Sequence, residues 1–123
     1  MIIFMVGAAG YSLLEVLWRG YTHWTMAITG GICFIAIWKI AVNLPQWSMM
    51  QKCLLGAAVI TAIECIVGYI VNIRLHMNVW DYSAMPFNLA GQVCLTYSVL
   101  WFLLCIPLMY FGQYLQSFFT RFL

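Results

Sequence analysis

Four long apolar stretches with very few charged residues constrain this chain more than any other feature. They run over residues 2–18, 25–44, 53–73 and 92–112. Stretches of this length suit helices that cross about 30 Å of hydrocarbon. Only 7% of the residues are charged, against about a quarter in soluble domains, so a soluble fold is excluded. We therefore predict an all-α integral membrane protein in which residues 1–123 form a single domain of four transmembrane helices.

Charge and cysteine content exclude several other classes. The formal net charge of +2 is small and scattered, which argues against a nucleic-acid partner. The five cysteines have no C-x-x-C spacing and lie mostly in apolar runs, so we expect buried thiols and no metal site. Gly30-Gly31 lacks the Lys-Ser/Thr end of a phosphate-binding loop, so we expect a packing notch and no cofactor. No positive segment precedes Ile2, which argues against a cleaved signal peptide.

The segment between the third and fourth stretches is the longest one that is not suited to lipid. We predict a structured loop there, at about residues 77–91. It contains Trp80-Asp81-Tyr82-Ser83, and Asp81 is one of only three acidic residues in the chain. Because loops held by a rigid scaffold often carry function, this loop is the first place to look for a site.

Glu15 and Arg19 are the first charged residues of the chain and lie four positions apart. That spacing places them on one helix face, and Tyr11 and His23 continue the row. A glutamate one turn inside the membrane boundary is costly unless it is paired or faces a cavity. Two interpretations remain open: an ion pair that only orients the helix, or a functional carboxylate that faces the interior of the bundle.

Glu64 lies near the middle of the third stretch. Thr61, Gly68, Asn72 and His76 lie at helical spacing from it, so they form one polar stripe on an apolar helix. No basic residue lies three or four positions away, so Glu64 is either protonated or paired with another segment. A neutral, hydrogen-bonded glutamate and a functional carboxylate are the two alternatives.

Four spans place both termini on the same side of the membrane. Lys39, Lys52 and Arg121 fall on that side, and Arg19 and Arg74 fall on the other. This difference favours cytoplasmic termini in a multi-pass protein of the cell membrane. We expect Lys39 to extend to the interface and Lys52 to be solvated in a polar loop.

The fourth stretch contains Pro107, which predicts a kink in its helix. We expect residues 113–123 to form an interfacial helix end after Gly112.

Most of the unusual side chains should gather at the end of the bundle away from the termini. We predict a polar pocket there with two intramembrane glutamates, open to one face. The candidate ligand-binding or transport residues are Glu15, Arg19, His23, Glu64, Asn72, Arg74, Trp80, Asp81, Tyr82, Ser83, Asn88 and Gln92. No catalytic residue and no metal ligand can be assigned from the spacing.

Residues 10–20, 21–26, 61–64 and 79–83 together resemble a known family, the putative ABC-transporter type IV or CmpB-like permease family, in its short form. The Trp-Asp-Tyr-Ser loop and the following span are also similar to the vertebrate transmembrane protein 229 family. The first resemblance implies membrane transport, but it carries no assigned substrate residues beyond these motif positions. The chain has no nucleotide-binding motif, so an ATP-driven transporter would need a separate ATPase subunit.

Three functions are compatible with these features. The leading hypothesis is a small membrane protein that binds or transports a small solute, lipid or ion. The alternatives are an accessory or scaffold subunit of a larger, ABC-type complex, and an integral-membrane lipid-modifying enzyme with His23, Glu64 and Asp81 as acid–base candidates. Besides the lipid bilayer, we expect a second copy of the chain as a partner, packed through Gly7, Gly10, Ala58 and Ala62.

Overall fold

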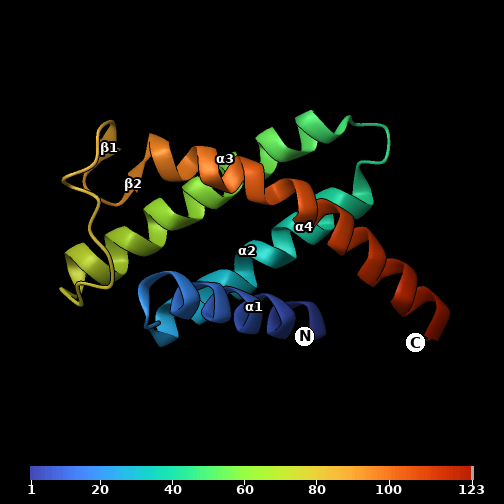
Figure 1. Ribbon diagram of the computed structural model, residues 1–123, viewed down its shortest axis with the longest axis horizontal. Coiled ribbons are helices and arrows are strands. Elements are labelled where there is room, and N and C mark those ends of the chain that lie inside the picture. The colour runs from blue at the N-terminus through green and yellow to red at the C-terminus, as the bar shows by residue number, and fades with distance from the viewer. Residues whose placement is uncertain (123) are drawn as a thin grey trace.

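The computed structural model describes residues 1–122, and within them four long helices form the protein (Figure 1). They are α1 (Ile2–Arg19), α2 (Trp24–Asn43), α3 (Met49–Gly68) and α4 (Leu95–Phe122). A π-helical segment, η1 (Tyr69–Arg74), continues α3 into a single span of 26 residues. All four are long and apolar enough to cross a membrane, which confirms the predicted fold class.

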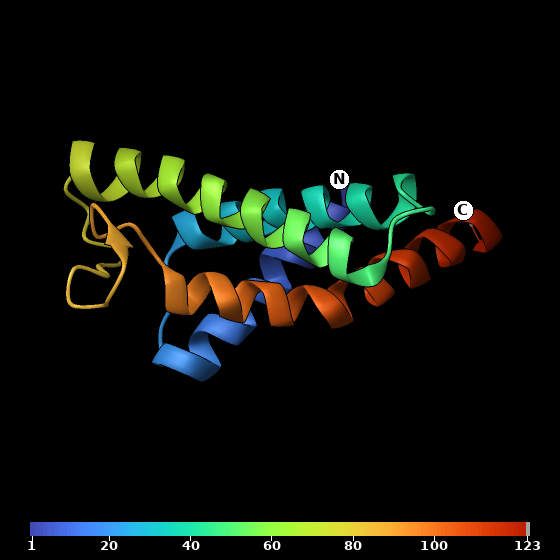
Figure 2. The same ribbon diagram turned by 90° about the horizontal axis from the view of Figure 1, so that it is seen from above.

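The antiparallel course of the helices separates the bundle into two ends. The termini and the α2–α3 loop lie at one end, and the α1–α2 turn, η1 and a small hairpin lie at the other (Figure 1). We call the second end the loop end. Figure 2 shows α3 and α4 running side by side away from it. Helix α2 packs against the other three helices, and 56% of its apolar stretch is buried, compared with 17% for α1 and α4. Helices α1 and α4 therefore present most of their surface to the surroundings.

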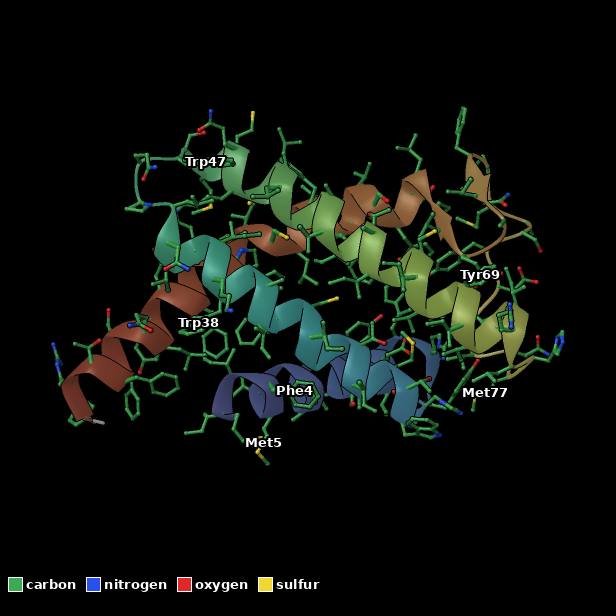
Figure 3. The ribbon with its side chains drawn as sticks, turned by 180° about the vertical axis from the view of Figure 1, so that it is seen from behind. Phe4, Met5, Trp38, Trp47, Tyr69 and Met77 are labelled. Atoms are coloured by element: carbon green, nitrogen blue, oxygen red, sulfur yellow. The ribbon has the colours of Figure 1, made fainter. Side chains whose placement is uncertain are left out.

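Glycines bring α1 and α2 into close contact. A Cβ added at Gly7 would lie 2.5 Å from the Cβ of Phe34 and 2.8 Å from the carbonyl oxygen of Gly30. Gly31 is covered by the ring of Phe4, which Figure 3 shows on α1. The predicted packing notch at Gly30-Gly31 is confirmed. Gly7 packs against α2, and a second copy at the small-residue flank around Gly7 stays a prediction.

A buried lysine closes the end of α2. Ser48 and Gln51 form a capping box at the start of α3, and the next residue, Lys52, is only 4% exposed. Its Nζ donates a hydrogen bond to the carbonyl oxygen of Ala41 over 3.2 Å, and Gln113 donates to the same oxygen over 3.4 Å. The last carbonyls of a helix have no partner within it and attract cations. The prediction of a solvated Lys52 is therefore wrong.

The predicted structured loop ends in a short hairpin. Strand β1 (Asn88–Leu89) pairs antiparallel with β2 (Val93–Cys94), and α4 begins directly afterwards. Figure 1 shows α4 bending partway along its length, in agreement with Pro107 inside it. The helix passes Gly112 and continues to Phe122, beyond the predicted end of the span. Gly112 faces α2, and an added Cβ there would lie 3.4 Å from the Cβ of Ala41, an ordinary van der Waals contact.

Candidate functional site

A cavity of about 680 Å³ lies between α1 and α4, with α2 as its floor. We call it the lateral groove. Apolar side chains from these three helices form most of its lining. Toward the loop end the lining also includes polar and aromatic residues, namely Tyr11, Glu15, Trp18, Arg19, Trp80, Tyr82, Tyr97 and Trp101. Leu14, Trp18 and Leu100 line the groove and are 51%, 74% and 41% exposed. The groove is therefore continuous with the outer surfaces of α1 and α4.

Glu15 and Arg19 form the charged part of the lateral groove. Their i,i+4 spacing on α1 brings Oε1 of Glu15 within 3.2 Å of Nη2 of Arg19, as the sequence predicts. Nη1 of Arg19 also donates to the carbonyl oxygen of Val79 over 3.1 Å, which joins the end of α1 to the loop. The guanidinium lies 4.4 Å from the ring centre of Tyr21.

The ion pair leaves hydrogen-bonding capacity unused. Glu15 is only 8% exposed. Among residues 1–122, Oε1 of Glu15 and both Nε and Nη2 of Arg19 are buried without a hydrogen-bond partner. The two groups are close enough to attract each other, but their geometry does not satisfy a hydrogen bond. A buried pair with unsatisfied atoms is costly to the fold, which makes it a candidate for a functional role.

Glu64 is 3% exposed and lies behind the wall of the lateral groove. Its Oε1 accepts a hydrogen bond from Nε1 of Trp101 over 3.2 Å, and its Oε2 accepts one from the hydroxyl of Tyr82 over 3.5 Å. Both partners come from segments other than α3, in agreement with the alternative that Glu64 pairs with another segment. Tyr82 and Trp101 line the groove, so Glu64 contacts the groove wall through these two side chains.

Aromatic rings from the loop and α4 build this wall. The ring of Tyr82 stacks on that of Tyr97 with centroids 4.8 Å apart and an interplanar angle of 15°. Burial raises the pKa of the Tyr82 phenol above its usual range, and the charge of Glu64 raises it further. Tyr82 therefore stays protonated and remains a hydrogen-bond donor at physiological pH.

Asn72 and Gln92 hold the loop in place. The side-chain amide of Asn72 donates to Oε1 of Gln92 over 2.8 Å, and its carbonyl oxygen accepts from the backbone N–H of Val79 over 2.7 Å. The indole of Trp80 donates to the backbone carbonyl of Gln92 over 2.9 Å. Gly68 makes room for this network, since an added Cβ would lie 2.5 Å from Oε1 of Gln92. These amides position the loop above the lateral groove.

The remaining predicted residues do not line the lateral groove. His23 caps α2, where its Nδ1 accepts a hydrogen bond from the backbone N–H of Thr25 over 3.3 Å. Arg74 is exposed at the end of η1 and forms no ion pair within residues 1–122.

Asp81, Ser83 and Asn88 form an exposed turn in the loop. Oδ1 of Asp81 accepts from the N–H of Ser83 over 2.8 Å, and hydrogen bonds from Ser83 lower the pKa of the carboxyl. The amide of Asn88 donates to the carbonyl oxygens of Ser83 and Met85 over 3.3 and 2.8 Å. Within the described chain, Asp81 pairs with neither Arg19 nor Arg74.

Several groove residues were not among the predicted site residues. Tyr11 lies one turn before Glu15 on the same face, so the helical period contained a signal for it. Trp101 and Tyr97 gave no such signal, because their contacts with Glu64 and Tyr82 join distant segments of the chain.

The fold defines a multi-pass membrane protein with four candidate spans among its described residues. The family model described as putative ABC-transporter type IV matches residues 2–123. The chain therefore belongs to this family, as the sequence motifs predicted. A search of curated proteins and a search of solved structures each found no match.

Proposed function

We propose that this protein binds a small amphiphilic molecule in the lateral groove and takes part in its transport across or within the membrane. The observation that carries the proposal is the buried pair of Glu15 and Arg19 at one end of an otherwise mainly apolar cavity of about 680 Å³. Ionisable side chains inside a membrane protein are costly and often mark a substrate pathway. Cavities of this size suit ligands the size of a drug molecule.

The lining of the lateral groove favours an amphiphile over a bare ion or a sugar-like solute. Leu14, Trp18 and Leu100 line it and also face the surroundings, so an apolar chain can enter from the lipid. The polar part of such a molecule would lie beside Glu15 and Arg19. Ligand sites commonly combine a mainly apolar lining with a few polar groups that fix orientation.

In this proposal the two intramembrane glutamates have different roles. Glu15 pairs directly with the ligand or with a cation, and Glu64 positions Tyr82 and Trp101 in the groove wall. The enzyme alternative has less support. Its acid–base candidates His23, Glu64 and Asp81 belong to a helix cap, the bundle interior and an exposed turn, and each has different partners.

We further propose that residues 1–123 act as one domain within a larger assembly. The family description favours an ABC-type complex, in which an ATPase would be a partner of residues 1–123. This keeps open the role of an accessory subunit. A second copy would pack through the hollow on α3 that includes Ala58 and Ala62. The basic residues of the termini end favour a cytoplasmic location for both termini.

Photolabelling in lipid nanodiscs tests the proposal. The probe is a 14-carbon monoacylglycerol with a diazirine in its chain, and peptide mass spectrometry locates the label. We expect labelling on the segments of α1 and α4 that line the lateral groove. Gly10 lines the groove and has no atom within 4 Å of an added Cβ among the described residues, so Gly10→Phe should fill the groove and abolish this labelling.

Ala9→Phe is the matched control. Ala9 is exposed on the same helix and does not line the lateral groove, so this variant should be labelled like the wild type. Equal labelling of the wild type and both variants would contradict binding in the groove.

A further inference from the structure

The charges in the lateral groove sum to zero. Among the described lining residues, Glu15 and Arg19 are the charged ones, and they lie 3.2 Å apart on α1. The side chain of Glu15 is 10% exposed and that of Arg19 is 22% exposed. A ligand that brought a single charge would pair with one of these residues and leave the opposite charge buried without a partner, which is strongly unfavourable.

Both members of the pair have hydrogen-bonding capacity that the described chain does not use. Oε1 of Glu15 is an acceptor without a donor, and Nε and Nη2 of Arg19 are donors without an acceptor. The other arm of Arg19, Nη1, is already engaged by the carbonyl oxygen of Val79, which fixes the guanidinium at the loop end. A ligand that satisfies these atoms must therefore offer one hydrogen-bond donor to Glu15 and at least one acceptor to Arg19.

We infer that the ligand is a single-chain amphiphile whose polar end is uncharged and carries both a hydrogen-bond donor and an acceptor, as a primary amide does. This inference rests on the proposed function of the lateral groove. The N–H of the amide donates to Oε1 of Glu15, and its carbonyl oxygen accepts from Nε or Nη2 of Arg19. The apolar chain extends along the groove toward the region of Phe34 and Phe111.

Charge complementarity favours an uncharged amphiphile over charged ones. A sulfate or carboxylate headgroup would compete with Glu15 for Arg19, and a quaternary ammonium would compete with Arg19 for Glu15.

The test compares three amphiphiles of equal chain length in lipid nanodiscs: tetradecanamide, tetradecyl sulfate and tetradecyltrimethylammonium. Each competes with a diazirine-labelled tetradecanamide, and the half-displacing concentration gives the relative affinity. We expect the amide to bind wild-type protein at least about tenfold more tightly than either charged compound. Equal affinity for all three would overturn the inference, while the proposed function would stand. If none of the three compounds displaced the probe and the probe gave no specific labelling, both the inference and the proposed function would be overturned.

Single substitutions reverse the preference in opposite directions. Glu15→Gln leaves Arg19 without its counter-charge, so the sulfate should gain at least about tenfold relative to the amide. Arg19→Gln should favour the ammonium in the same way. Lys39→Gln, which removes an exposed charge outside the groove, is the control and should keep the wild-type order. An unchanged order in both groove variants would contradict the assignment of Glu15 and Arg19.

Two further measurements keep the test decisive. Circular dichroism shows whether each variant retains its helices, and if a groove variant unfolds, the wild-type order decides alone. Gly10→Cys in the membrane tests for a second copy in the groove. Efficient disulfide formation between two such chains would mean that a helix occupies the lateral groove and would overturn the inference.

Discussion

The contact between α1 and α2 gives the most specific stability prediction, because the same substitution on the same helix should have different effects at two positions. A Cβ at Gly7 would lie 2.5 Å from the Cβ of Phe34 and 2.8 Å from the backbone oxygen of Gly30. Neither atom belongs to the flexible end of a side chain. At Gly10, three residues later, an added Cβ meets no atom of the described chain within 4 Å.

The magnitudes follow from two terms. Replacing glycine by alanine inside a helix gains about 0.8–1.0 kcal/mol, and this gain is the same at both positions. Overpacking a tight contact costs typically about 1–3 kcal/mol and applies only at Gly7. The propensity term cancels in the comparison, so Gly7→Ala should be less stable than Gly10→Ala by about 1–3 kcal/mol.

The assay is equilibrium unfolding in mixed micelles with increasing dodecyl sulfate, followed by tryptophan fluorescence and circular dichroism. Gly10→Ala should unfold at the same or a higher dodecyl sulfate fraction than the wild type, and Gly7→Ala at a lower one than Gly10→Ala. If both variants unfolded together, the close approach of α1 to α2 would be refuted. Because α1 forms one wall of the lateral groove, that result would also remove the structural basis for the site.

Three other predictions concern the two ends of the bundle. Lys52→Met removes a buried donor at the end of α2 and should destabilise the protein by about 1.5–3 kcal/mol in the same assay, whereas exposed Lys39→Met should stay within about 0.5 kcal/mol. Hydrogen bonds from Ser83 lower the pKa of Asp81 in the folded protein. The stability that these bonds give the loop is therefore fully present above the unfolded pKa of aspartate, and it is lost as the pH falls through the lower folded pKa. An NMR titration that places the Asp81 pKa at or above its usual value would disprove this. Trp80→Phe removes the indole N–H that donates to the buried backbone carbonyl of Gln92, so this variant should lose about 1–3 kcal/mol of stability. Hydrogen exchange in the loop should become faster, and an unchanged exchange rate would argue against the role of this hydrogen bond.

The membrane fold could be predicted from sequence because apolar length alone identifies a span. The ends of the spans were less predictable. The fourth helix was expected from Gln92, but β2 uses Val93 and Cys94 first. The span was expected to end at Gly112 with an interfacial helix end after it, and the structure has one continuous helix that reaches Phe122.

The candidate site likewise has one part that the sequence predicts and one part that it does not. The Glu15–Arg19 pair follows from i,i+4 spacing, which is a local property of a helix. The lateral groove depends on how α1 and α4 lie across α2, and no spacing in the sequence encodes that arrangement. The hydrogen bonds of Glu64 to Tyr82 and Trp101 span 18 and 37 residues. Lys52 was misjudged for a related reason, since its partner Ala41 lies on the preceding helix.

A structure of the wild-type protein determined in a lipid nanodisc would test the central claim most directly. The account predicts elongated density in the lateral groove between α1 and α4, with its polar end within hydrogen-bonding distance of Glu15 and Arg19. A groove closed by direct packing of α1 on α4, or filled by a helix from a second copy, would contradict it.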